Sequence, residues 1–126
     1  MYSIYHHIKL LRPLNVITSG MAVLMATAIL AELDNHHTLS LTIIIVMLFT
    51  AASNSLNDAL DYEIDLINRP HRPIPSNYVS IQGALSISLI LFLVGASLCL
   101  QLPGLAIAVG IFLAIPLIIV YCASLK

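Results

Sequence analysis

Apolar and polar positions follow one another along this chain in long blocks rather than residue by residue. Four blocks are almost entirely apolar, and each is close to the roughly 20 residues that a helix needs to cross a bilayer. The blocks cover residues 14–31, 39–61, 81–101 and 105–121. We therefore predict an all-α fold, a polytopic transmembrane helical bundle with four spans in a single domain over residues 1–126, and a motif-bearing loop at 62–80.

The first apolar block has a second interpretation. Lys9 and Arg12 precede it, as basic residues precede the apolar core of a secretory signal peptide. The length of the block and the three further blocks behind it favour a membrane span instead.

The composition agrees with a membrane protein. Apolar residues make up 60% of the chain, charged residues only 9%, and the mean hydropathy is +1.00. A soluble domain carries about 25% charged residues. With a net charge of −1 and no basic patch, the chain lacks the cations that nucleic-acid binding requires.

The basic residues predict an orientation. If four spans cross the membrane, both termini and the 62–80 loop lie on the same side. The lysines and arginines all fall on that side, and they are Lys9, Arg12, Arg69, Arg72 and Lys126. By the positive-inside rule, we expect an integral protein of the cytoplasmic membrane whose termini and acidic motif face the cytoplasm.

Carboxylates gather where the second apolar block ends. On a helix, five carboxylate or amide side chains would fall within an arc of about 100°. They are Asn54, Asn57, Asp58, Asp61 and Asp65, whereas Glu63 points away. Because like charges on one helix face repel, a divalent cation would stabilise them, and oxygen donors suit Mg²⁺ better than Zn²⁺. A solvated helix end is the simpler interpretation, but carboxylates at a membrane edge favour the metal.

A proline-rich segment from Asn68 to Ser80 follows the carboxylates and cannot form a regular helix. It contains Arg69 and Arg72, whose guanidinium groups are suited to bidentate hydrogen bonds with phosphate oxygens. A basic loop beside a membrane could have the same composition without that role. Magnesium, arginine and an apolar bundle beneath them together favour a substrate with a diphosphate head and an isoprenoid tail.

Several stretches resemble the UbiA superfamily of intramembrane prenyltransferases. N-D-A-L-D-Y-E-I-D at 57–65, continued by I-N-R-P-H-R-P-I-P-S at 67–76, is similar to that family's first aspartate-rich motif, NDxxDxxxD, which closes its second transmembrane helix. L-R-P-L-N at 11–15 is similar to the start of its first helix, and Y-C-A-S-L-K at 121–126 to the Y-x-x-x-L-K at the end of its fourth. The resemblance covers nearly the whole chain.

The resemblance implies the N-terminal portion of a nine-span helical bundle that binds magnesium and a polyprenyl diphosphate at two aspartate-rich motifs. The implied metal ligands are Asn57, Asp58, Asp61 and Asp65. Asp61 and Asp65 are the expected catalytic residues, and Asp58 is expected to stand behind the other ligands. The implied substrate contacts are Arg72 and Lys126 at the diphosphate and Asn15 near the reacting end.

The segment at 67–76 is closest to the branch that holds digeranylgeranylglyceryl phosphate synthases and chlorophyll synthases. We therefore expect a geranylgeranyl group to move from its diphosphate to a lipid acceptor such as geranylgeranylglyceryl phosphate. Three alternatives stay open: a chlorophyll-synthase-like tetrapyrrole acceptor, an aromatic acceptor, and a non-catalytic cation-binding membrane subunit that uses the same acidic face.

The chain departs from the family pattern at two points. Where that branch has glycine after P-I-P-S, this chain has Asn77, which can also adopt a left-handed turn. The second aspartate-rich motif, expected after a fifth helix, is missing. The chain thus resembles the N-terminal half of an enzyme, for which we expect a C-terminal half as partner and little turnover without it.

Overall fold

The computed structural model describes residues 2–30 and 34–124, and within these ranges every regular element is a helix. The helices are α1 (Tyr2–Leu11), α2 (Pro13–Ile29), α3 (His36–Leu60), α4 (Tyr62–Asn68), α5 (Ile81–Cys99), α6 (Gly104–Ala108), the π-helical η1 (Val109–Ala114) and α7 (Ile115–Ser124). The all-α prediction is confirmed. Residue 31, the expected end of the first span, and Lys126 lie outside the described residues.

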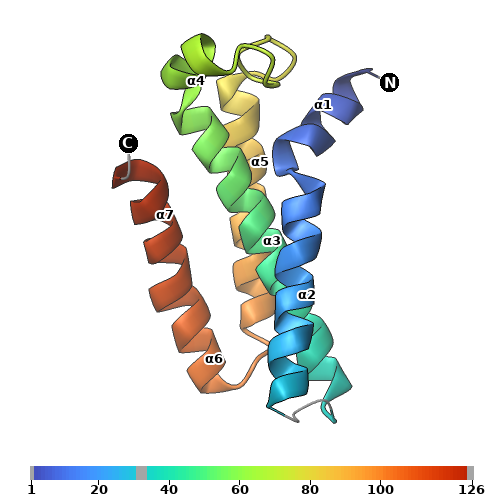
Figure 1. Ribbon diagram of the computed structural model, residues 1–126. Coiled ribbons are helices and arrows are strands. Elements are labelled where there is room, and N and C mark those ends of the chain that lie inside the picture. Colours follow the sequence, from blue (N-terminus) through green and yellow to red (C-terminus); the bar gives the residue numbers. More distant parts are fainter. Residues whose placement is uncertain (1, 31–33, 125–126) are drawn as a thin grey trace.

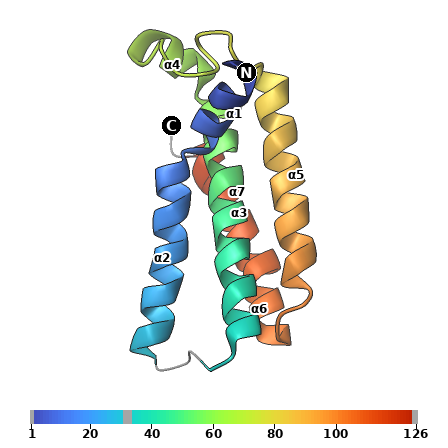
Figure 2. The same ribbon diagram turned by 90° about the vertical axis from the view of Figure 1, so that its right-hand side faces the viewer.

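Three helical stretches are long and apolar enough to cross a membrane. They are His36–Leu60, Ile81–Cys99 and the continuous Gly104–Ser124, and a fourth span results if α1 and α2, bent by 42° against each other, count as one. Helix α3 lies at the centre of the bundle, in contact with α2, α5 and α7 (Figures 1 and 2). Helices α1 and α4 lie together at one end, the end where α7 finishes (Figure 1).

Small residues bring α3 and α5 close together, and buried hydroxyl groups join them. Ser55 Oγ donates to the carbonyl oxygen of Ala84 at 2.8 Å, and Ser88 Oγ donates to that of Ala52 at 2.9 Å. In an apolar surrounding, such paired hydroxyls fix the register of two helices, because sliding would leave them unsatisfied. The central helix is therefore held firmly where it carries the acidic motif.

Helix α7 reaches α3 through an apolar cluster built on the buried Ile45, Phe49 and Cys99. The chain enters α7 through the π-helical η1, two residues before Pro116. Proline lacks an N–H and crowds the preceding turn, so a locally widened helix accommodates it. Beyond this cluster, α7 leaves room beside α3 for the pocket described below.

The segment 62–80, expected as a loop, begins with the short helix α4. Asp61 interrupts the α3 direction at φ −86° and ψ 8°, and α4 then lies across the end of α3 (Figure 1). Helical bonding resumes because no proline or glycine occurs until residue 70: the Asp65 N–H donates to the Asp61 carbonyl and the Arg69 N–H to the Asp65 carbonyl, at 2.8 and 2.9 Å.

The proline-rich segment after α4 is anchored to the helices. Ile74 and Val79 are buried in a cluster with Leu10 of α1, Ala59 of α3 and Ala84 of α5. Asn77 has φ 61°, which confirms the left-handed turn expected at that position. The segment is therefore packed against α1, α3 and α5, and Arg72 is held near α3 by its ion pair to Asp58.

Candidate functional site

Asp58 is the centre of an ion-pair network that joins α1, α3 and the proline-rich segment. Its side chain is buried, and its Oδ1 accepts from Nη2 of Arg12 and, at 3.1 Å, from Nη1 of Arg72. Arg72 Nη1 also contacts Oδ2 of Asp65, which is buried as well. Two guanidinium groups and two carboxylates thus neutralise one another at a place where an unpaired charge would be costly.

Arg12 reaches this network because the backbone turns sharply between α1 and α2. Its φ of 53° is left-handed, and Pro13 follows at the first position of α2. A residue before proline is disfavoured in the right-handed helical conformation, so the helix breaks there. The left-handed conformation is unfavourable for arginine, and the ion pair to Asp58 contributes to offsetting that cost.

Three of the residues predicted as metal ligands share one pocket. Asn57 Nδ2 donates to Oδ2 of Asp61 at 2.8 Å, and Asp65 lies a turn further on. The pocket, here called the polar pocket, has a volume of about 390 Å³ and is lined by Arg12, Asn57, Asp61, Ile64, Asp65, Asn68, Arg69 and Arg72. Asp58 does not line it, since its carboxylate is directed to the two arginines. The arginine predicted to bind diphosphate, Arg72, does.

The donor set of the polar pocket suits a hard cation. Asp61 and Asp65 offer carboxylate oxygens, and Asn57 and Asn68 offer amide oxygens, which are the ligand types that magnesium takes. Within residues 2–30 and 34–124, no three histidine, cysteine, aspartate or glutamate side chains are grouped as a metal site. Two carboxylates with waters and substrate phosphates are nevertheless a usual coordination for magnesium, so the residues fit the ion.

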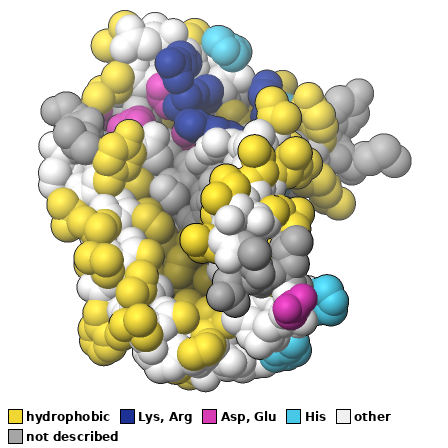
Figure 3. Space-filling model, turned by 60° about the horizontal axis from the view of Figure 1, so that its bottom comes forward, with side chains coloured by type: hydrophobic (Ala, Val, Ile, Leu, Met, Phe, Trp, Pro, Cys, Tyr) yellow, Lys and Arg dark blue, Asp and Glu magenta, His cyan; other side chains and the backbone are white. Residues whose placement is uncertain are grey.

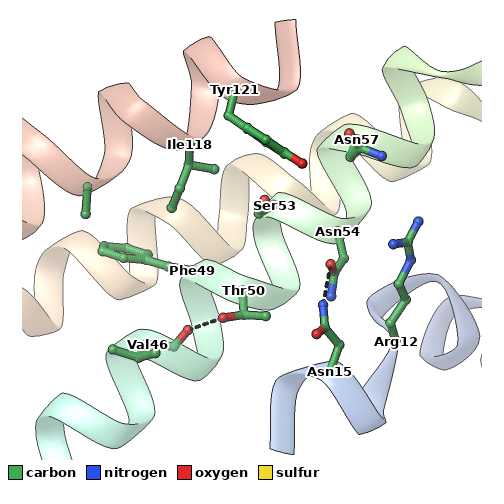
Figure 4. Close-up of a pocket in the computed structure, with 11 residues that line it drawn as sticks. Arg12, Asn15, Val46, Phe49, Thr50, Ser53, Asn54, Asn57, Ile118 and Tyr121 are labelled. Atoms are coloured by element: carbon green, nitrogen blue, oxygen red, sulfur yellow. Dashed lines mark hydrogen bonds between the residues drawn. The ribbon is translucent and has the colours of Figure 1, made fainter. Parts of the chain in front are cut away.

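A second pocket continues from the first along α3 toward α7. This bundle pocket has a volume of about 470 Å³ and is lined by Arg12, Asn15, Val46, Phe49, Thr50, Ser53, Asn54, Asn57, Ala114, Ile118 and Tyr121 (Figure 4). Arg12 and Asn57 line both pockets. Figure 3 shows basic and acidic side chains gathered at one end of a hollow whose walls are largely hydrophobic. The site therefore has a charged end and an apolar body.

Asn54 connects the bundle pocket to the first two helices. Its Oδ1 accepts from Nδ2 of Asn15 at 3.1 Å (Figure 4), and its Nδ2 donates to the carbonyl oxygen of Leu11 at 2.9 Å. Asn15, predicted to lie near the reacting end of a substrate, is thereby held at the pocket wall. The carbonyl of Leu11 comes from the last residue of α1, so the same amide also fixes the bend at Arg12.

Replacing Asn54 by leucine tests this connection. The variant removes both hydrogen bonds while nearly keeping the volume, and leaves the Asn15 amide and the Leu11 carbonyl without these partners. We expect the free energy of unfolding in detergent to fall by about 2 kcal/mol, the usual cost of unsatisfied polar groups. Thr50→Val is the matched control, since the Thr50 hydroxyl bonds only the Val46 carbonyl of its own helix and its loss should be nearly neutral. An equal effect of both variants would contradict the connecting role.

The structure adds two residues to the site that the sequence motif did not indicate. Arg12 and Tyr121 line the site although neither was among the predicted site residues. For Arg12, the signal available in the sequence was its place before Pro13, and for Tyr121 its place in the last stretch of family resemblance. Lys126, the remaining predicted diphosphate contact, lies outside the part of the chain that the structure describes.

Comparison with known proteins gives consistent matches. The sequence model of the UbiA prenyltransferase family matches residues 15–126. The chain is 39% identical over 103 residues to digeranylgeranylglyceryl phosphate synthase of Natronomonas pharaonis, covering 82% of this chain and 37% of the relative. It is also 39% identical over 120 residues to the protein of that name from Methanosphaera stadtmanae, covering 95% of this chain and 43% of the relative.

A solved structure from work on digeranylgeranylglyceryl phosphate synthase in membranes has the same fold. It superimposes with a TM-score of 0.89 at 27% sequence identity, over 98% of this chain and 44% of that chain. This chain thus spans about two fifths of the length of the relatives that it matches. Its apolar helices and these matches identify an integral membrane protein.

Proposed function

Since the chain belongs to the UbiA prenyltransferase family, we propose that it forms the diphosphate-binding part of a magnesium-dependent intramembrane prenyltransferase. The group transferred is geranylgeranyl, and the acceptor is a lipid such as geranylgeranylglyceryl phosphate. The names of the relatives support this donor and acceptor, because a digeranylgeranylglyceryl phosphate carries two geranylgeranyl groups. The rest of the enzyme, corresponding to the remaining length of the relatives, is the proposed partner.

The observation that carries the proposal is the junction of two pockets of opposite character. The polar pocket offers guanidinium, carboxylate and amide groups, whereas Val46, Phe49 and Ile118 give the bundle pocket apolar walls. Arg12 and Asn57 belong to both. A diphosphate head and a hydrocarbon tail joined by one C–O bond fit this arrangement, with the reacting bond near the junction.

In the proposed site, Asn57, Asp61 and Asp65 hold magnesium, and Asp58 acts through the two arginines that it binds. Bound magnesium would neutralise charge on the diphosphate as it departs. Arg72 and Arg12 supply further positive charge at the same end, fixed in position by Asp58 before the substrate arrives. Asp58 is thus a positioning residue for the arginines, in keeping with the outer place expected for it.

The proposed transfer reaction has three steps, and the charged and apolar parts of the site favour them in turn. The allylic C–O bond breaks, and the diphosphate leaves with the electron pair. The apolar walls of the bundle pocket keep water from the cationic carbon. The hydroxyl oxygen of the acceptor forms the new C–O bond and releases its proton, which completes an ether. Asn15, held by Asn54 at the pocket wall, is suited to position the reacting end.

The proposed orientation has the charged end in the cytoplasm. Helix α4, the proline-rich segment and α1, which carries Lys9 and is followed by Arg12, lie at one end of the bundle (Figure 1). The concentration of basic residues there supports a cytoplasmic location by the positive-inside rule.

The test adds the part of a relative that this chain does not match. Membranes carrying this chain together with the C-terminal remainder of the Methanosphaera stadtmanae relative are given labelled geranylgeranyl diphosphate, magnesium and geranylgeranylglyceryl phosphate. We expect labelled ether product from the assembled pair, and none when the chain carries Asp61→Ala. Co-purification of the two parts shows that they have assembled. An assembled pair that forms no product would contradict the proposal.

A further inference from the structure

The bend between α1 and α2 creates a third hollow, which shares Arg12 and Asn15 with the bundle pocket and adds Lys9. The two helices meet at 42°, and the left-handed Arg12 followed by Pro13 forms the corner. The hollow, here called the elbow pocket, has a volume of about 520 Å³ and is lined by Lys9, Arg12, Pro13, Leu14, Asn15 and Thr18. The described residues that line it belong to α1, α2 and the corner between them.

Two cationic side chains, Lys9 and Arg12, line the elbow pocket. Lys9 is exposed, and its ammonium group makes no ion pair with any described residue. Arg12 contacts Asp58 through Nη2 alone, which leaves other N–H groups of its guanidinium for a second acceptor. The Thr18 hydroxyl is already used, since it donates to the Asn15 carbonyl at 2.9 Å. The hydrogen-bond donors that remain available, those of Lys9 and Arg12, are therefore cationic, and an anionic ligand suits them.

The surroundings of the elbow pocket are apolar. Leu14, which lines the pocket, is 76% exposed, and Ile4, Tyr5 and Ile8 are exposed on α1. Ile17 and Met21 are exposed on α2. In a membrane protein, an exposed apolar helix face lies against lipid, and lysine and arginine beside it extend toward the headgroups. The cations of the elbow are thus placed at the level of lipid phosphates.

We propose that the elbow pocket binds the phosphate group of a membrane lipid, with Lys9 and Arg12 on the phosphate oxygens and Pro13 and Leu14 against the first part of the lipid chain. Charge and polarity select this ligand: two cations at the end of an apolar face attract an anionic headgroup and disfavour a neutral or zwitterionic one. The phosphate could belong to a bilayer phospholipid or to a phosphate-bearing ether lipid that serves as acceptor.

The chain has no tryptophan, which permits a local measurement. Leu14→Trp places a single fluorophore in the elbow pocket, and quenching by lipids brominated in their acyl chains reports which headgroup is bound beside it. The chain is reconstituted with brominated phosphatidylglycerol or brominated phosphatidylcholine in otherwise identical vesicles. Leu85→Trp, on the exposed side of α5 near the same end of the bundle, is the matched control for the surrounding lipid.

We expect phosphatidylglycerol to bind beside Trp at position 14 about fivefold more strongly than phosphatidylcholine, and Lys9→Gln to lower that preference about fivefold, whereas Lys9→Arg keeps it. The control at position 85 should show no preference. Equal quenching by both lipids at position 14, or a preference that survives Lys9→Gln, would overturn the proposal. Neither magnesium nor diphosphate is present, so the result is independent of the proposed transferase activity.

A competition separates the two sources of phosphate. Unlabelled geranylgeranylglyceryl phosphate and unlabelled phosphatidic acid, which both carry a phosphate monoester, are added at equal mole fraction to vesicles with brominated phosphatidylglycerol. Stronger relief of quenching by the ether lipid identifies the elbow pocket as a subsite for the acceptor. Equal relief by both identifies it as a site for anionic bilayer lipids. Relief by neither would contradict a site for phosphate.

Discussion

Arg72→Ala should lower the free energy of unfolding by about 3 kcal/mol, because it leaves a buried carboxylate without its cation. The Arg72 side chain is 17% exposed, and it contacts both Asp58 and Asp65. Asp58 keeps Arg12 in the variant, whereas Asp65 loses the only ion pair that it makes with a described residue. Unfolding of the chain in detergent measures the effect.

Two further variants decide whether the effect comes from charge. Arg69→Ala removes an arginine three residues away that is exposed and forms no ion pair within the described ranges; it should change stability by no more than about 0.5 kcal/mol. In the double variant Arg72→Ala with Asp65→Asn, the unpaired charge is gone, so part of the lost stability should return. Purely additive effects would show that Arg72 and Asp65 are not coupled.

Asp61→Ala should weaken magnesium-dependent binding of geranylgeranyl diphosphate at least about tenfold, the range expected even for residues that only support metal ligands. Asp61 faces the polar pocket, where it accepts the Asn57 amide at 2.8 Å, and it is half-buried, so its loss should affect binding more than folding. The measurement is a titration of the purified chain with the diphosphate, with and without magnesium.

Glu63→Ala is the control for Asp61→Ala. Glu63 belongs to the same motif and carries the same charge, but it is exposed and lies outside the polar pocket. It should bind the diphosphate as the unchanged chain does. If both variants lost binding equally, the motif would act through its overall negative charge rather than through the geometry of the pocket.

The sequence was sufficient to predict the all-helical class and the grouping of three side chains of the acidic motif. Apolar blocks of bilayer length gave the all-helical class, and the spacing of Asn57, Asp61 and Asp65 placed them on a common face. The structure has these three residues in one pocket with Arg72. The helical repeat alone predicts which of these side chains are neighbours, because residues three and four apart on a helix lie next to each other regardless of the rest of the fold.

The parts that could not be predicted depend on contacts between distant segments. Asp58 follows the spacing of the motif, yet its carboxylate is directed to Arg12, which lies 46 positions earlier in the chain. The interruption of the helix at Asp61 also separates α4 from α3, so a single helical wheel does not describe the whole motif. Only the packing of α1 and the proline-rich segment against α3 decides which carboxylates meet arginine and which remain in the pocket.

In the proposed function, a single site holds diphosphate at its charged end and the prenyl tail in its apolar body. The most direct test compares the binding of geranylgeranyl diphosphate, inorganic diphosphate and magnesium alone to the purified chain in detergent. We predict binding of geranylgeranyl diphosphate that requires magnesium and is tighter than that of inorganic diphosphate, because the bundle pocket adds apolar contact. Magnesium binding that is the same with and without either diphosphate, and unchanged in Arg72→Ala, would contradict the proposed function and indicate a cation-binding subunit instead.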